Sequence, residues 1–314
     1  MKLYRRGFDD YRGKREVTTF SVDELIPYFI EFPKDKFCSV FDGLMYCYCL
    51  PPKTSFGDIN IDQFNKIMQV VFKTPVDIVE HKFVNLKLVT PLQIYIGSKS
   101  DCDIQIDHPT VSERHAVINV VSSTEIWLTD LKSRFGTQLN DREVFPDIKT
   151  PVRLNDNINF GLVRSYLKTA AWVYSSLATR FGMRLNTDFE RIVIRYFSGR
   201  IIKRIINDIN IGIEKFTIRN ALTNQFESFT MNDLKAIFWV KNLIGDPSRV
   251  DRQGFIKEAD PSNMFLEFKD GECQWGSHTG YSPRSSGFFF YPHDPDSNNI
   301  KCYIPRDSLN YVLL

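Results

Sequence analysis

The chain lacks several features that would place it in a functional class at once. Its 314 residues carry 40 Lys and Arg against 38 Asp and Glu, a net charge of +2. Such a balance gives no global field toward nucleic acid or an anionic membrane. No window approaches the roughly 18 consecutive apolar residues of a membrane span, and no apolar run follows the charged N-terminus. We therefore expect no membrane association.

The sequence also lacks a recognisable cysteine framework. Its six cysteines are Cys38, Cys47, Cys49, Cys102, Cys273 and Cys302. No nearby Cys or His pair completes a ligand set, so the spacing fits neither a zinc site nor a disulfide scaffold. We expect buried free thiols, no metal, no other cofactor, and a reducing intracellular compartment, with nucleus and cytoplasm both open.

Catalytic motifs are missing as well. The chain has no P-loop, dinucleotide fingerprint, HExxH, EF-hand loop or kinase motif. A polar loop over 274–287 combines Ser, His and Arg, but it has no nucleophile elbow. The prediction is a protein that is not an enzyme. The alternative, an enzyme in the C-terminal region, predicts His278 and a carboxylate within hydrogen-bonding reach.

Apolar and aromatic residues are abundant. Aromatics make up 14% of the chain and include 26 Phe, so packed cores are expected along most of it. A capping box, Ser21 to Glu24, predicts a short helix after it. Residues 38–50 read as a buried strand or hairpin, and residues 60–71 as a second helix.

The middle and the end of the chain have different patterns. Alternating segments at 83–89, 92–96, 116–120 and 126–128, separated by turns, predict a β-sandwich. Two further capping patterns predict helices carrying Phe189–Phe197 and Leu234–Lys241. Residues 254–314 read as strands and loops, and no internal repeat is evident.

Short motifs follow one another in a set order between Ile96 and Gly161. They are Ile96-Gly97, Asp103-Ile104, Val111-Ser112-Glu113-Arg114-His115, Asp130-Leu131, Gly136-Thr137 with Asn140 beyond it, and Leu154–Gly161. This order and spacing resemble a forkhead-associated (FHA) domain, a reader of phosphothreonine peptides. The resemblance covers roughly 80 residues and implies two β-sheets in a sandwich, with binding loops at one end.

The resemblance assigns roles to individual residues. Ser112 matches the serine that binds phosphate oxygens, and Arg134 lies where a Thr, Arg or Lys often reaches the same phosphate. Lys99 is a further candidate point charge. The residues expected to shape and brace the binding loops are Gly97, His115, Gly136 and Asn140.

Three positions differ from what the family has or often has. Ser98 stands where the family has a phosphate-binding arginine, and Phe135 where it has an asparagine that bonds the peptide backbone. Thr110 occupies a position that some relatives fill with a peptide-contacting arginine. The implied function is a non-catalytic interaction module, an adaptor or a complex subunit, that binds phosphothreonine-containing protein partners in a weakened or atypical way.

The fold class that follows is α+β. A central FHA-like antiparallel sandwich over 83–168 lies between an N-terminal α/β extension over 1–82 and a C-terminal α+β domain over 170–314. The functional alternative is a nucleic-acid-associated factor that uses a basic helical region at 180–204. Its candidate contacts are Arg191, Arg195, Arg200, Lys203 and Arg204. The simpler interpretation of this region is the solvated face of an amphipathic helix.

Overall fold

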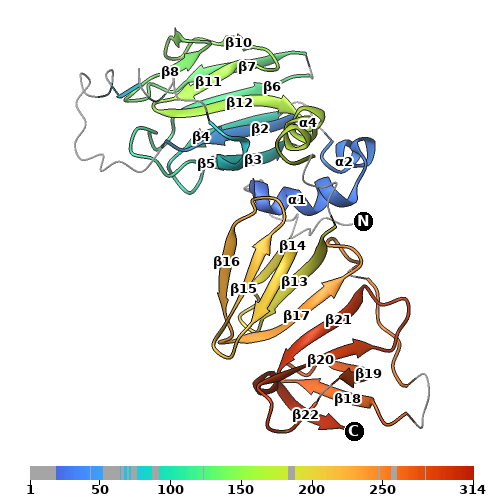
Figure 1. The fold of residues 1–314 in the computed structure, drawn as a ribbon. Coiled ribbons are helices and arrows are strands. Elements are labelled where there is room, and N and C mark those ends of the chain that lie inside the picture. Colours follow the sequence, from blue (N-terminus) through green and yellow to red (C-terminus); the bar gives the residue numbers. More distant parts are fainter. Residues whose placement is uncertain are drawn as a thin grey trace. The chain divides into compact units, whose positions relative to one another are not determined.

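A computed structural model gives the fold of the chain (Figure 1). The residues it describes are 19–42, 44–51, 64, 67–68, 71, 76–86, 92–122, 124–182, 188–246, 248–255, 260–279 and 281–314. They form two compact units, Met1–Leu177 and Ala178–Leu314, and each is described by itself. None of the described helices is long and apolar enough to cross a bilayer.

Three short helices of the first unit share an aromatic cluster. They are α1 (Val22–Glu31), α2 (Lys34–Val40) and α4 (Ala170–Phe181). The predicted capping box is confirmed, because the Glu24 carboxylate accepts hydrogen bonds from the Ser21 backbone N–H and hydroxyl. Tyr174 of α4 packs edge-on against Phe29 of α1 and Phe37 of α2, with ring centroids 5.1 and 5.4 Å away.

Two sheets make the sandwich of the first unit. The seven-stranded sheet has the order β1-β3-β2-β12-β11-β8-β9, and the five-stranded sheet has the order β10-β7-β6-β4-β5. Their strands are β1 (Thr19–Ser21), β2 (Leu44–Cys49), β3 (His81–Leu86), β4 (Leu92–Gly97), β5 (Ile104–Gln105), β6 (Ala116–Val120), β7 (Ile126–Asp130), β8 (Thr137–Leu139), β9 (Arg142–Val144), β10 (Thr150–Val152), β11 (Asn157–Phe160) and β12 (Val163–Thr169). The alternation that predicted β4, β6 and β7 is confirmed.

The N-terminal strands belong to the sandwich itself. β2 lies between β3 and β12, all antiparallel, and Tyr46 and Tyr48 of β2 join the same core as Phe160. The predicted strand over 38–50 is therefore correct for Leu44–Cys49 but wrong for residues 38–40, which end α2. Most of the predicted helix over 60–71 lies outside the described residues, although the described ones there have helical backbone.

The described strands of the second unit form one ten-stranded sheet, of order β16-β15-β14-β13-β17-β21-β20-β19-β18-β22. The strands are β13 (Glu190–Tyr196), β14 (Ile201–Ile211), β15 (Lys215–Asn220), β16 (Phe226–Thr230), β17 (Leu234–Val240), β18 (Asn263–Phe268), β19 (Cys273–Thr279), β20 (Gly287–Pro292), β21 (Asn299–Pro305) and β22 (Leu309–Leu313). The expectation of strands over 254–314 is confirmed.

The two helices predicted for this unit are wrong. Ile192, Ile194 and Tyr196 are buried while their neighbours are not, which is the two-residue period of β13. All seven residues of β17 are buried, as in a strand covered on both faces, so its apolar pattern has no period that separates strand from helix. The described residues from 188 onward contain strands and one 3-10 turn, Arg306–Ser308.

The ten-stranded sheet is an internal duplication, which the sequence did not reveal. One half of the sheet has the order β16-β15-β14-β13-β17 and the other has β21-β20-β19-β18-β22. Numbered along the chain, each half therefore places its five strands side by side in the order fourth, third, second, first, fifth. The fifth strand of the first repeat, β17, then pairs antiparallel with the fourth strand of the second, β21. We call these halves repeat 1 (190–240) and repeat 2 (263–313).

The backbone register confirms the duplication at its first hairpin. In repeat 1 the turn is closed by a hydrogen bond from Tyr196 N–H to the Arg200 carbonyl, and in repeat 2 by one from Phe268 N–H to the Glu272 carbonyl. A register shift precedes Tyr196 in the β13·β17 ladder and Phe268 in the β18·β22 ladder. The two turn glycines, Gly199 and Gly271, both have φ of 83°.

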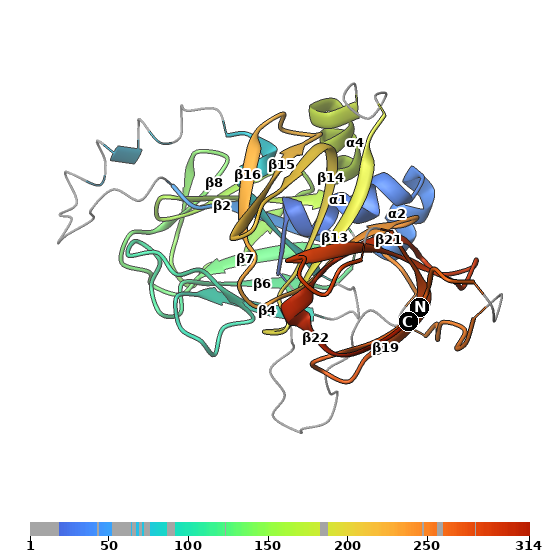
Figure 2. The ribbon, with the colours of Figure 1, turned by 60° about the horizontal axis from the view of Figure 1, so that its bottom comes forward.

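The last turn of each repeat also matches. Leu234 N–H bonds the Met231 carbonyl before β17, and Leu309 N–H bonds the Arg306 carbonyl before β22. Met231 therefore corresponds to Arg306 and Leu234 to Leu309, which aligns β16 with β21 and β17 with β22 residue by residue. Figure 2 shows the strands of repeat 2, in orange and red, curving into an arc. The backbone pattern is repeated with different side chains, which explains why the duplication is not visible in the sequence.

Candidate functional site

His115 is the hub of the loops at one end of the sandwich. Its side chain is fully buried. The Ser112 N–H donates to its Nδ1 at 3.0 Å, and its Nε2 lies 3.1 Å from the Gly136 carbonyl oxygen. Because a backbone N–H can only donate, Nδ1 is the unprotonated nitrogen and Nε2–H donates to Gly136. One imidazole thus joins two loops that are distant in the sequence.

The electrostatics of this hub favour the neutral ring. Burial lowers the pKa of His115 to about 4, against a hydrogen bond to Gly136 and the charge of Asp130, which both favour protonation. The nearest carboxylate oxygen of Asp130 is 4.0 Å away, and that carboxylate accepts from the Ser133 N–H and hydroxyl and from the Thr137 hydroxyl. The neutral histidine therefore holds the two loops together at neutral pH.

Ser112 connects three segments. Its carbonyl accepts from Ser98 N–H at 3.0 Å, and its hydroxyl oxygen accepts from Arg134 N–H at 2.9 Å. The backbone carbonyl of the next residue, Glu113, accepts a hydrogen bond from Lys99 N–H at 3.2 Å. Since the Ser112 oxygen acts as an acceptor in this contact, its own hydrogen can be donated to a ligand. The residues predicted to contact phosphate are thus brought together at one end of the sandwich.

Glycine is required at the loop ends for two different reasons. A Cβ on Gly97 would lie 2.1 Å from the Glu113 carbonyl oxygen, so the two loops approach each other too closely for any side chain. Gly136 has open space around it but φ of 73°, a left-handed conformation that other residues adopt only with strain. Both positions match glycines of the family pattern.

The cationic groups of the site are accessible. Arg134 is exposed. Lys99 Nζ is 3.4 Å from a Glu113 carboxylate oxygen, and both side chains are more than half exposed. Exposed pairs of this kind are weak, so an anionic ligand can compete for the lysine.

Two of the predicted residues lie elsewhere. Thr110 is 1% exposed, and its hydroxyl accepts from Leu162 N–H at 2.9 Å, so in this conformation it cannot touch a peptide. Asn140 lies at the β8–β9 turn, where its side chain bonds Asp156 and the Asn157 N–H. It braces the opposite end of β8 and β11 from the loops around Gly136.

Phe135 has a partner that sequence reasoning missed. Its ring centroid lies 4.9 Å from that of Phe64, which is buried. The Arg134 guanidinium lies over the Phe135 ring, 5.0 Å from its centroid. Gln138 Nε2 also approaches the Met68 sulfur at 3.4 Å. Phe64 of the N-terminal region therefore covers the position where the family has its peptide-binding asparagine. The apolar spacing of Phe64 and Met68 was the only signal of this contact.

Comparison with known proteins identifies the class of this sandwich. Residues 94–161 match the model of the FHA domain family, and this part of the chain is an FHA domain. Residues 188–314, which hold both repeats, match a family of unknown function (DUF6982).

Individual relatives match parts of the chain. It is 35% identical over 69 residues to the FHA domain-containing protein PS1 of Arabidopsis thaliana, a match covering 22% of this chain and 5% of that protein. Among solved structures it is similar to EmbR of Mycobacterium tuberculosis in complex with a low-affinity phosphopeptide (25% identity, 24% of this chain and 20% of that one, TM-score 0.23). Another is the FHA domain of CT664 from Chlamydia trachomatis (16% identity, 40% and 97%, TM-score 0.28).

The basic region 180–204 does not form the predicted helix around its candidate contacts. Arg191, Arg195 and Lys203 lie on one face of the β13–β14 hairpin, whereas Arg204 lies on the other and Arg200 near the turn. Arg204 pairs with Glu227 at 3.0 Å, and Arg195 with Glu272 at 3.7 Å. Strand geometry therefore places three of these charges on one face and Arg204 on the other, and two of the five, Arg195 and Arg204, are paired with acids.

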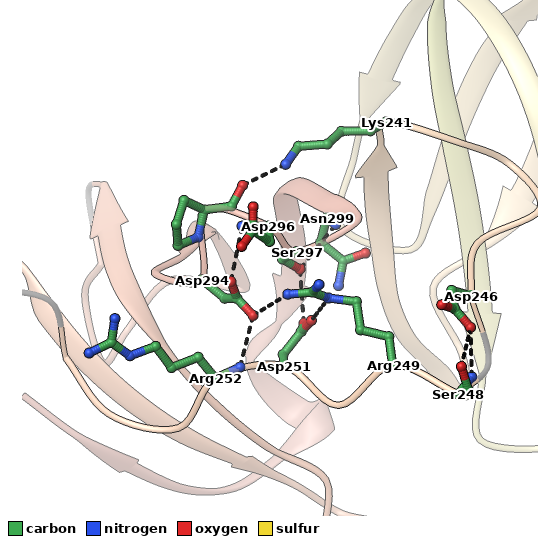
Figure 3. Close-up of polar contacts among 11 residues, drawn as sticks. Lys241, Asp246, Ser248, Arg249, Asp251, Arg252, Asp294, Asp296, Ser297 and Asn299 are labelled. Carbon is green, nitrogen blue, oxygen red and sulfur yellow. Dashed lines mark hydrogen bonds and ion pairs between the residues drawn. The ribbon is translucent and has the colours of Figure 1, made fainter.

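Two loops of the second unit, around residues 249–252 and 294–297, are held together by a network of hydrogen bonds and ion pairs (Figure 3). The Asp294 carboxylate, 9% exposed, accepts from the Arg249 guanidinium and from Arg252 N–H. The Ser297 hydroxyl donates to Asp251 at 2.8 Å. These carboxylates tie the segment 249–252 to the β20–β21 turn, which is a structural task.

The predicted His278–carboxylate cluster is not formed among the described residues. His278 Nδ1 instead accepts a long contact, 3.4 Å, from Tyr281 N–H, and the two rings pack edge-on. Nor do the described residues gather three His, Cys, Asp or Glu side chains in a way that suits a metal ion. The candidate site of this chain is accordingly the FHA loop end.

Proposed function

We propose that this chain is a phosphothreonine-dependent interaction module of atypical design, acting as an adaptor or a complex subunit. FHA domains are phosphopeptide-dependent interaction modules, and residues 94–161 are one. In the proposal Ser112 and Arg134 bind the phosphate, and Lys99 adds a point charge. A phosphothreonine carries nearly two negative charges and several acceptor oxygens, which this donor set suits.

The observation that carries the proposal is the position of Ser112. Its oxygen accepts from Arg134 N–H and its carbonyl from Ser98 N–H, so the hydroxyl, Arg134 and the 98–99 loop surround one point. His115 holds that arrangement from below through the Ser112 N–H. The hydroxyl hydrogen, the exposed guanidinium and the Lys99 ammonium are the donors offered to a ligand.

The atypical design concerns both the phosphate contact and the peptide contact. Ser98 has no charge to offer where the family has a phosphate-binding arginine, and the Phe135 ring packs at a tilt of 35° against Phe64 of the same chain. The proposal is that peptide selection at this position depends on the apolar pair and not on backbone hydrogen bonds. The expected affinity is lower than that of a reader with the full donor set, by about 1.5–3 kcal/mol for one lost charge-assisted bond.

The test is binding of the full chain to a degenerate peptide library in phosphothreonine and threonine forms. We expect the phosphorylated form to bind, and Arg134→Ala to weaken binding by about 10- to 150-fold. Adding Ser112→Ala to Arg134→Ala should weaken the binding further. Arg153→Ala is the matched control, since Arg153 is an exposed arginine in the turn before β11, near Asp156 and Asn140.

The outcomes separate clearly. Equal binding of both peptide forms, or equal losses in Arg134→Ala and Arg153→Ala, would contradict the proposal. A loss confined to Ser112→Ala and Arg134→Ala supports it. In the proposal the binding module includes the N-terminal strands β1 and β2, which pair within the seven-stranded sheet of the sandwich, and Phe64 comes from the same part of the chain. The compact units support a boundary near Leu177.

A further inference from the structure

The two outer strands of the ten-stranded sheet are β16 and β22. On the side away from its neighbour, each leaves a row of backbone N–H and C=O groups without a strand partner among the described strands. Soluble proteins blunt such edges with lysine, proline or bulges. β22 is Leu-Asn-Tyr-Val-Leu, without charge or proline, and β16 is Phe-Glu-Ser-Phe-Thr, with one acid.

The two edges are the complementary halves of an interface that already exists inside the chain. β22 is the fifth strand of repeat 2, and its equivalent in repeat 1, β17, pairs with β21. β16 is the fourth strand of repeat 1, and its equivalent in repeat 2 is β21 itself. The junction between the repeats therefore shows how a free fifth strand joins a free fourth strand.

The equivalence fixes a register for such a pairing. The junction pairs Ile237 with Tyr303, Phe238 with Cys302, and Trp239 with Lys301. Carried over through the matched turns before β17 and β22, the corresponding pairs on the free edges are Val312 with Ser228, Leu313 with Glu227, and Leu314 with Phe226.

Exposure at these positions agrees with a missing partner. In the junction Phe238 and Cys302 are buried, whereas the equivalent Leu313 is 52% exposed. Leu314 and Phe226, at 67% and 71%, are also unusually exposed for apolar residues. Glu227 is already paired with Arg204 at 3.0 Å, which lowers the cost of covering its charge with an apolar strand.

We propose that this chain associates head to tail with a second copy of itself, β22 of one copy pairing antiparallel with β16 of the next in the register of the β17·β21 junction. Neither strand contains proline, so none of the backbone N–H groups that point away from the existing neighbour is missing from either edge. The contact is heterologous, so repeated addition builds a closed ring or an open filament. Each addition extends the repeat pattern by one more junction.

The test is sedimentation velocity of the full chain from about 1 to 100 µM, with one variant for each edge. Phe226→Lys disables β16 and Leu313→Lys disables β22. Both side chains are at least half exposed, so the fold should persist, which a thermal melt by circular dichroism checks. Ile213→Lys, at an 80% exposed position in the β14–β15 turn, is the matched control.

The expected result has three parts. The parent chain and Ile213→Lys form species that grow with concentration, and each edge variant alone self-associates at least tenfold more weakly. An equimolar mixture of the two edge variants forms a 1:1 dimer and nothing larger, since one copy retains β22 and the other β16. A register check is oxidation of Ser228→Cys mixed with Val312→Cys, which should cross-link faster than Ser228→Cys mixed with Tyr311→Cys.

Three results would overturn the proposal. One is a parent chain that stays monomeric over the whole range. Another is self-association abolished by one edge variant and untouched by the other, which indicates a symmetric contact of one edge with itself. The third is a mixture of edge variants that forms no dimer although both are folded.

Discussion

The FHA sandwich and the C-terminal sheet hold their strands in place by different means. In the sandwich, one buried histidine and a few loop contacts, each present once, join segments far apart in the sequence. In the C-terminal unit, a backbone pattern of hairpin, bulge and turn is used twice with different side chains. A fold built on single contacts is sensitive at those points, whereas a repeated fold spreads its stability over equivalent positions.

The largest effect that this comparison predicts is at Gly97. Gly97→Ala places a Cβ 2.1 Å from the Glu113 carbonyl oxygen, and backbone must move to relieve it. We expect a loss of about 3 kcal/mol or more in the free energy of unfolding of the first unit. Amide hydrogen exchange of residues 92–160 at increasing denaturant concentration measures this loss of stability.

Gly136→Ala is the control for that variant. Gly136 has open space around it and only its φ of 73° opposes a side chain, so the cost should be about 1–2 kcal/mol. Equal costs for the two glycines would show that the loop contact at Gly97 is not a special point of the sandwich.

The next effect is a pH response of the sandwich. The pKa of His115 is about 4 in the folded chain, lowered by burial, and 6.5 is its ordinary value. The unfolded chain therefore takes up this proton first as the pH falls. The free energy of unfolding should be unaffected above pH 6.5 and fall by roughly 3 kcal/mol between pH 6.5 and 4.

His115→Gln tests which group causes the response. The variant should be less stable at pH 7 but should lose less stability on acidification. Burial also lowers the pKa values of His81 and His108, so part of the slope will remain. An unchanged slope in the variant would assign the response to those histidines instead.

A smaller effect is expected where the repeats differ. Lys235 of β17 is buried and lies 2.6 Å from carboxylate oxygens of both Asp270 and Glu272. Lys235→Met should cost about 2 kcal/mol, because the carboxylates are partly exposed and can be solvated. Asn310, its exposed equivalent in repeat 2, should tolerate Asn310→Met within about 0.5 kcal/mol. Chemical denaturation of both variants gives the comparison.

The smallest effect tests the duplication directly. Gly199 and Gly271 have the same φ of 83° and no atom within 4 Å of an added Cβ. Gly199→Ala and Gly271→Ala should each cost about 1 kcal/mol, equal within about 0.5 kcal/mol. Clearly unequal melting shifts would mean that the two hairpins are not energetically equivalent.

Some features of this protein were determined by its sequence alone. Motifs from Gly97 to Gly161 predicted an FHA sandwich, because turns that need glycine and loops that need a bracing histidine leave few residue choices. The alternation that predicted β4, β6 and β7 has the same local origin. The sequence did not predict that the Thr110 hydroxyl accepts a hydrogen bond from Leu162 N–H or that Phe64 packs against Phe135, since both contacts join distant segments.

Tertiary structure decided the C-terminal unit. β17 is buried on both faces, so its apolar residues have no period, and the pattern of Phe189–Phe197 fits a helix as well as β13. The pairing of strands settled both cases in favour of a sheet. The duplication was equally invisible, because backbone hydrogen bonds carry it and they do not depend on which side chain is present. Side-chain identity determined the sandwich loops, whereas backbone pairing determined the repeats and the two edges they leave open.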